Sequence, residues 1–95
     1  MWQLREGSHP ILTDEGGAIL SEHTGRWTYL TPTAASAVLS LVSSTDEDQA
    51  IVRFAILYGL KREQAAADVR AVAAALIDQG LARTEPSRRR RWWWR

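Results

Sequence analysis

The chain has 95 residues, of which 45% are hydrophobic and 24% charged, the proportions of an ordinary globular domain. This length suits one small domain with a single modest core. The absence of cysteine excludes disulfides, thiolate metal ligands and cysteine nucleophiles, and we expect a cytoplasmic protein. No apolar run approaches the length of a membrane span, and the start lacks the apolar core of a signal peptide, so we expect neither feature.

The two ends of the chain differ from its body. Residues 1–82 carry 6 basic and 10 acidic side chains, whereas residues 83–95 carry 6 arginines and one glutamate. We interpret residues 83–95 as a basic, Arg- and Trp-rich tail without regular structure; the alternative is a tail that holds phosphate or anionic lipid. Residues 1–8 are expected to be a loosely ordered segment in which Trp2 and Leu4 are the possible anchors to the body.

Turn composition and alternation predict three strands in the first third of the chain. Residues 14–17 and 23–25 are rich in turn-forming residue types. Gly25 suits the left-handed position of a short hairpin loop. The strands are expected at residues 9–13, 18–22 and 26–30.

Three helices are expected to follow the strands. Thr31 and Pro32 are typical of an N-cap and a first helical position. Residues 44–47 have the pattern of a capping box for the second helix, and Gly59 is expected to end it. The third helix begins without a capping side chain at Lys61. The first and third helices are expected over about residues 32–42 and 62–79.

The predicted order of elements is therefore three strands followed by three helices. We predict an α+β fold with winged-helix-like architecture, in which a three-stranded antiparallel sheet has the three helices on one side. Three strands cannot close into a barrel, so the sheet keeps two free edges. One domain is expected over residues 9–82.

The sequence gives little support for catalysis. Its only histidines, His9 and His23, lie beside a proline and in a turn, and no nucleotide-binding loop, nucleophile elbow or zinc-protease motif occurs. Ser8, His9 and Asp14 are the residue types of a catalytic triad, but three such residues within a loop are expected by chance. We predict that the protein is not an enzyme and uses no metal and no cofactor.

A small winged-helix DNA-binding regulator is the alternative function, because three helices with a small sheet are also the elements of a winged helix. Binding in a DNA groove requires a basic face. The predicted third helix instead carries Glu63, Asp68 and Asp78 against Arg62 and Arg70, and the body of the chain is acidic. We therefore expect no specific nucleic-acid partner.

The predicted strand at residues 26–30 is a free edge beside helical structure, because the chain runs directly from it into a helix. This strand lacks the Lys, Pro or inward-pointing charge that usually blunts an edge. Trp27 and Tyr29 lie on one face of it. Either they simply pack, or the edge accepts an extended peptide as an added strand. The broad Ala- and Val-rich face of the third helix offers a wall for side chains of such a peptide.

Several short motifs stand in a characteristic order along the chain. They are Gly25-Arg26-Trp27, Leu30 with Pro32-Thr33-Ala34, Tyr58-Gly59-Leu60, Ala65-Ala66-Ala67-Asp68-Val69 and Gly80-Leu81. In this order and spacing, over about residues 9–82, the chain resembles the PqqD-like proteins. These are the leader-peptide recognition elements of ribosomally made, modified peptides (RiPP recognition elements). As a stand-alone domain, the chain is most similar to the recognition proteins of lasso-peptide biosynthesis.

The resemblance implies a winged-helix-like fold that binds the leader of a precursor peptide as an extra strand, between the third strand and the third helix. It also implies delivery of the precursor to a leader peptidase and a lasso cyclase. The tail has no counterpart in the family pattern. Main-chain pairing along the strand adds Arg26 to the peptide-binding residues that the resemblance implies, which are Trp27, Thr28, Tyr29, Leu30, Asp68, Val69, Val72, Ala73 and Leu76.

Overall fold

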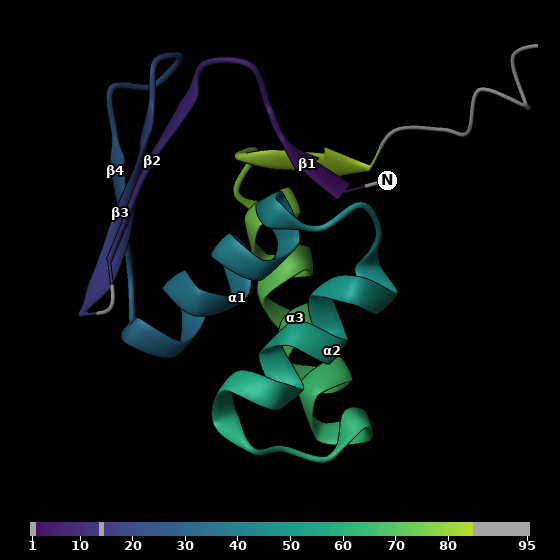
Figure 1. Ribbon diagram of the computed structural model, residues 1–95. Helices are drawn as coiled ribbons and strands as arrows, with labels where there is room; N and C mark the ends of the chain where they lie inside the picture. The colour runs from purple at the N-terminus through teal and green to yellow at the C-terminus, as the bar shows by residue number, and fades with distance from the viewer. Residues whose placement is uncertain (1, 14, 85–95) are drawn as a thin grey trace, which may run out of the picture.

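The computed structural model describes residues 2–13 and 15–84, which form strands at both ends and three helices between them (Figure 1). The α+β class and the order of three strands and three helices are confirmed. No helix in this part of the chain is long and apolar enough to cross a membrane. The elements are β1 (Trp2–Leu4), β2 (Ser8–Thr13), β3 (Gly16–Ser21), β4 (Trp27–Leu30), α1 (Pro32–Ser43), α2 (Glu47–Tyr58), α3 (Arg62–Asp78) and β5 (Ala82–Thr84).

Strands β2, β3 and β4 form the antiparallel sheet, in that order. The turn between β3 and β4 is a glycine bulge. The N–H of Gly25 donates to the Ser21 carbonyl at 2.8 Å, and the N–H of Ser21 donates to the Arg26 carbonyl at 2.9 Å, so two residues oppose one. The bulge requires a left-handed residue at its first position, and Gly25 has φ = 71°.

The helix starts follow local capping chemistry, with one correction. The Thr31 hydroxyl accepts from the Ala34 N–H at 3.1 Å, as the sequence predicts. The predicted capping box at residues 44–47 is not formed, because the cap of α2 is Asp46, whose carboxylate accepts from the Gln49 N–H at 2.8 Å. A charged acceptor makes a stronger hydrogen bond than a hydroxyl, which favours Asp46 over Ser44 as the cap.

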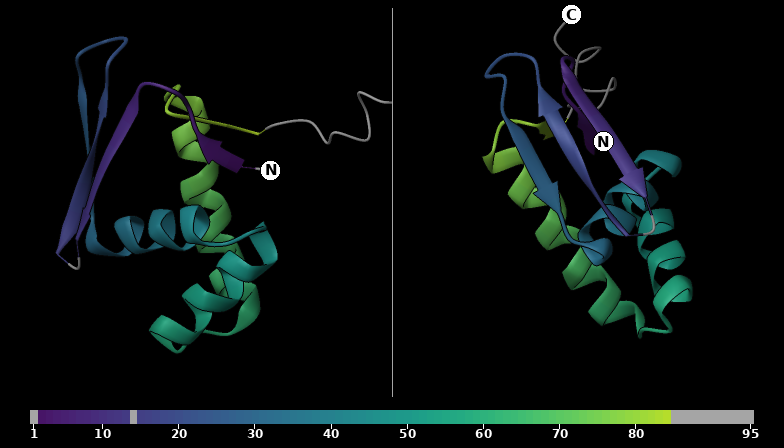
Figure 2. Two further views of the ribbon diagram at one scale, coloured as in Figure 1. Left: turned by 45° about the horizontal axis from the view of Figure 1, so that its top comes forward. Right: turned by 90° about the vertical axis from the view of Figure 1, so that its left-hand side faces the viewer.

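Helix α1 lies at the centre of the core. It contacts β2, β3 and β4 on one side and α2 and α3 on the other. Figure 2 shows α1 running from the sheet toward α3. The largest fully buried side chains come from all of these layers and are Phe54, Ile19, Ile51, Leu76, Val38 and Val69.

A second sheet, which the sequence does not predict, joins the two ends of the described chain. Strands β1 and β5 pair antiparallel, with Trp2 opposite Thr84. Trp2 is only 8% exposed, and its indole N–H donates to the Ala73 carbonyl at 3.1 Å. Residues 2–4 thus form a strand where a loosely ordered segment is expected. Residues 85–95, most of the predicted tail, lie outside the described residues.

The burial of Trp2 predicts a large stability loss in the Trp2→Ala variant. Removing a buried indole and its hydrogen bond is expected to lower the free energy of unfolding by about 3 kcal/mol. Trp27→Ala is the matched control, because Trp27 is 45% exposed, and its cost is expected to stay below about 1 kcal/mol. Urea unfolding followed by circular dichroism measures both, and equal losses would contradict the anchoring role of Trp2.

Candidate functional site

The outer edge of β4 is unpaired within the described residues, because β4 is the last strand of its sheet. In an antiparallel pair, backbone groups point alternately toward the partner strand and away from it. The bond between Ser21 and Arg26 fixes this alternation. Ile19 opposite Thr28 is then the next inward-bonded pair, and the N–H and C=O groups of Trp27 and Tyr29 point to the free edge.

Helix α3 lies beside this free edge. The right-hand view of Figure 2 shows β4 as the sheet strand next to α3. The two are joined where the Thr28 hydroxyl donates to Oε1 of Gln79 at 3.2 Å. On a helix, positions 68, 72, 75 and 79 fall on one stripe, so the side of α3 that faces β4 also carries Asp68 and Val72. We call the space between β4 and this stripe the β4–α3 groove.

The predicted peptide-binding residues divide between this groove and the core. Trp27 and Tyr29 are exposed on the outer face of β4, with Tyr29 at 81%, and Arg26 is exposed at its start. Thr28 and Leu30, together with Asp68 and Val72 of α3, are partly buried at the groove. The remaining three predicted helix residues lie in the core and are Val69, Ala73 and Leu76.

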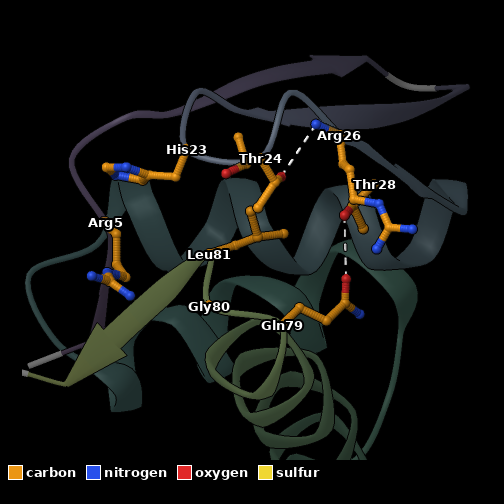
Figure 3. Close-up of a pocket in the computed structure, with 9 residues that line it drawn as sticks. Arg5, His23, Thr24, Arg26, Thr28, Gln79, Gly80 and Leu81 are labelled. Carbon is orange, nitrogen blue, oxygen red and sulfur yellow. Dashed lines mark hydrogen bonds between the residues drawn. The ribbon is translucent and has the colours of Figure 1, made fainter.

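A hollow of about 510 Å³ lies at the end of the groove nearest the β3–β4 turn. Figure 3 shows Arg5 and His23 on one side of it, with Arg26 and the Thr28–Gln79 hydrogen bond on the other. Its lining comes from four places in the chain: the segment after β1, the β3–β4 turn, β4 and the end of α3. The lining residues are Arg5, Ser21, His23, Thr24, Arg26, Thr28, Gln79, Gly80 and Leu81.

The hollow collects positive charge in a domain that is otherwise acidic. Among the described residues, neither Arg5 nor Arg26 forms an ion pair with a carboxylate. The His23 ring contributes Nε2, which lies 3.3 Å from the Glu6 carbonyl. The hollow is therefore a place where an anionic group gains favourable interactions.

The arginines of α3 are, by contrast, already engaged by α2. Arg62 lies 3.2 Å from Asp48, and Arg70 lies 2.7 Å from Glu47. The hydrogen bond and the charge of the Glu47 carboxylate raise the pKa of the Arg70 guanidinium. Both pairs tie the start and middle of α3 to the start of α2, so α3 presents no unpaired arginine within the described chain.

The residues considered for a catalytic triad have other partners. The Ser8 hydroxyl donates to the Leu81 carbonyl at 3.1 Å, and Nε2 of His9 lies 3.0 Å from Oε1 of Glu22. Asp14 lies outside the described residues. Within the described ranges, no group of three His, Asp or Glu side chains is close enough to hold a metal ion.

Sequence reasoning missed several residues that line the groove. Gln79 could have been predicted from the sequence, because it continues the helical stripe that begins at Asp68. Arg5 could not, since it reaches the hollow through the pairing of β1 with β5, and three-residue strands carry too little periodicity to be recognised. For His23 and Thr24, the sequence indicates only a turn.

The fold and the groove define a class of small α+β domains in which an unpaired strand edge faces a helix. The chain belongs to the PqqD family: the sequence model of coenzyme PQQ synthesis protein D matches residues 16–82, more than half of the chain. This confirms the resemblance seen in the short motifs. No curated protein sequence matches the chain.

Two solved structures share the fold. A lasso peptide synthetase B1, complexed with the leader peptide, is 25% identical to this chain with a TM-score of 0.75, over 87% of this chain and 98% of that one. TbiB1, in complex with the TbiA(beta) leader peptide, is 15% identical with a TM-score of 0.77, over 90% of this chain and 99% of that one. Both similar structures therefore contain a bound leader peptide.

The division of α3 into a core face and a groove face predicts unequal effects of two matched truncations. Val69 is fully buried, and Val69→Ala is expected to lower the free energy of unfolding by about 2 kcal/mol through lost burial and a small cavity. Val72 is only partly buried, and Val72→Ala is expected to cost less than about 1 kcal/mol. Urea unfolding of both variants measures the difference, and the reverse order would show that the faces are misassigned.

Proposed function

We propose that this protein binds the leader segment of a ribosomally made precursor peptide as an added strand between β4 and α3. The observation that carries the proposal is the β4 edge, which has no pairing strand among the described residues and lies beside α3. Membership of the PqqD family and the leader-peptide complexes of the two similar structures support it.

Affinity in this proposal comes first from main-chain pairing. The outward N–H and C=O groups of Trp27 and Tyr29 offer an extended peptide a ready partner. Alternate leader side chains then lie on the two faces of the extended sheet. Those on the inner face meet Leu30 and Val72, and those on the outer face lie beside Tyr29. Because ordering a flexible leader is costly, a few buried anchors must supply most of the net binding energy.

The proposal extends to the pathway that the resemblance implies. The protein acts without catalysis of its own, in the cytoplasm, and delivers the precursor of a lasso peptide to a leader peptidase and a cyclase. Residues 9–82 form a winged-helix-like recognition domain, and residues 1–8 join it through β1. Of the predicted helix residues, Asp68 and Val72 contact the leader, whereas Val69, Ala73 and Leu76 act indirectly by setting the position of α3.

The ion pairs of α3 weigh against the alternative of a DNA-binding regulator. In that role α3 is the natural reading helix, and its arginines are needed for phosphates and base edges. Arg62 and Arg70 are instead held by Asp48 and Glu47 of α2. Engaging DNA requires breaking both pairs and exposes the two carboxylates to the phosphates.

The direct test is a titration of a fluorescein-labelled leader, taken from the precursor encoded beside this protein, followed by fluorescence anisotropy. We expect saturable binding with a dissociation constant of about 10 μM or below. A scrambled leader of the same composition is the control, and it is expected not to bind. No change in anisotropy at tens of micromolar protein would end the proposal.

The backbone alternation along β4 predicts opposite outcomes for two neighbouring proline substitutions. Tyr29→Pro removes an outward N–H, so the fold is expected to persist while leader affinity falls more than about tenfold relative to Tyr29→Ala. Thr28→Pro removes an N–H that points to β3, so it is expected to lower the thermal midpoint of the fold. Circular dichroism and the same anisotropy titration separate these effects. Equal leader binding by Tyr29→Pro and Tyr29→Ala would rule out pairing at this N–H.

A further inference from the structure

We propose that the hollow beside Arg5, His23 and Arg26 is a subsite for one acidic side chain of the bound leader. The inference rests on the proposed function, because it assigns the chemistry of one leader position in the β4–α3 groove. It makes the hollow a specificity-determining element that also fixes the register of the leader.

The position of the hollow ties it to the path of an added strand. Arg26 immediately precedes β4, and Thr28 within β4 lines the same hollow. Side chains at positions 26, 28 and 30 lie on one face of the strand, the face on which Thr28 reaches Gln79. A leader residue opposite Arg26 on this face therefore has its side chain at the mouth of the hollow. Opposite charges on neighbouring strands stabilise such a pair.

The charges around the hollow favour a carboxylate. Arg5 and Arg26 lack a carboxylate partner within the described chain, and a planar guanidinium matches a carboxylate in a bidentate manner. The acidic side chain nearest in sequence to the turn, Glu22, is engaged at 3.0 Å by His9. An acidic side chain of the leader can therefore become the carboxylate partner of Arg5 and Arg26.

One acidic side chain of α3 lies farther along the groove. Asp68 is partly buried on the groove stripe of α3 and has no ion-pair partner among the described residues. It lies about 16 Å along the helix from Gln79, which lines the hollow. A leader placed in the reverse direction moves its acidic residue away from Arg26 and toward Asp68. The acidic subsite therefore selects direction as well as register.

The test is a double-mutant cycle with the fluorescein-labelled leader of the neighbouring precursor. Each acidic residue of the leader is replaced in turn by its amide, and every peptide is titrated against the wild type, Arg26→Gln and Arg5→Gln. We expect one leader position, and no other, at which the amide weakens binding to the wild type about five- to tenfold. The same amide is expected to have little further effect on binding to Arg26→Gln.

Two control variants test whether the effect is specific to Arg26. Arg53→Gln removes an exposed arginine of α2, outside the hollow, and is expected to leave leader affinity unchanged. Arg26→Glu is expected to weaken binding of the native leader and to restore affinity for a leader that has Lys at the identified position. This exchange of charges distinguishes a specific pair from general attraction of an acidic peptide to a basic patch.

The outcomes separate this inference from the proposed function. If the native leader binds but every amide variant binds equally well, or if the losses are the same in Arg26→Gln and the wild type, the subsite is wrong and strand addition stands. A leader without any acidic residue that still binds also overturns it. If the native leader does not bind at all, the proposed function fails and this inference fails with it.

Discussion

The packing of α1 between the sheet and the other two helices is the constraint on which the groove depends. Five α1 residues are buried. Three of them belong to the hydrophobic core and are Ala37, Val38 and Leu41. Because α1 contacts the sheet on one side and α3 on the other, it fixes where β4 lies relative to α3. The free edge and the helical wall are therefore positioned by the hydrophobic core and not by their own contact.

Few interactions join α3 directly to β4. The helix touches the core through small residues such as Ala65 and Ala73, which let neighbouring backbones approach closely. Its partly buried flank then faces β4, and in the described part of the chain one side-chain hydrogen bond, from Thr28 to Gln79, joins the two elements. A groove that contains so few internal bonds loses little when a strand enters, since few existing interactions must be broken.

Local patterns explain how much of the fold is predictable from the sequence. Alternation, Gly25 and the Thr31-Pro32 start are signals within a few residues, and they yield the hairpin and the helices. The β1–β5 pairing joins segments about eighty residues apart in sequence, and no local signal reports it. On α3, an Ala-rich helix has little contrast between its faces, so Val69 and Val72 look alike in sequence although only Val69 is fully buried. The place of the groove and four residues beside it, Thr28, Leu30, Asp68 and Val72, were therefore predictable. The assignment of core and groove faces on α3 and the hollow at Arg5 required the structure.

The outer edges of β2 and β4 differ in their capacity to pair with another strand. The N–H of Glu22 donates to the Gly7 carbonyl at 2.9 Å, and alternation from this bond turns the backbone of Pro10 outward. A proline on the outer edge offers no N–H to another strand, so the β2 edge is blocked against pairing. The β4 edge has no such residue, but α3 stands beside it and limits what can approach. A single extended segment can pair with the β4 edge and also fit in the space beside α3, whereas a second sheet is too wide to enter there.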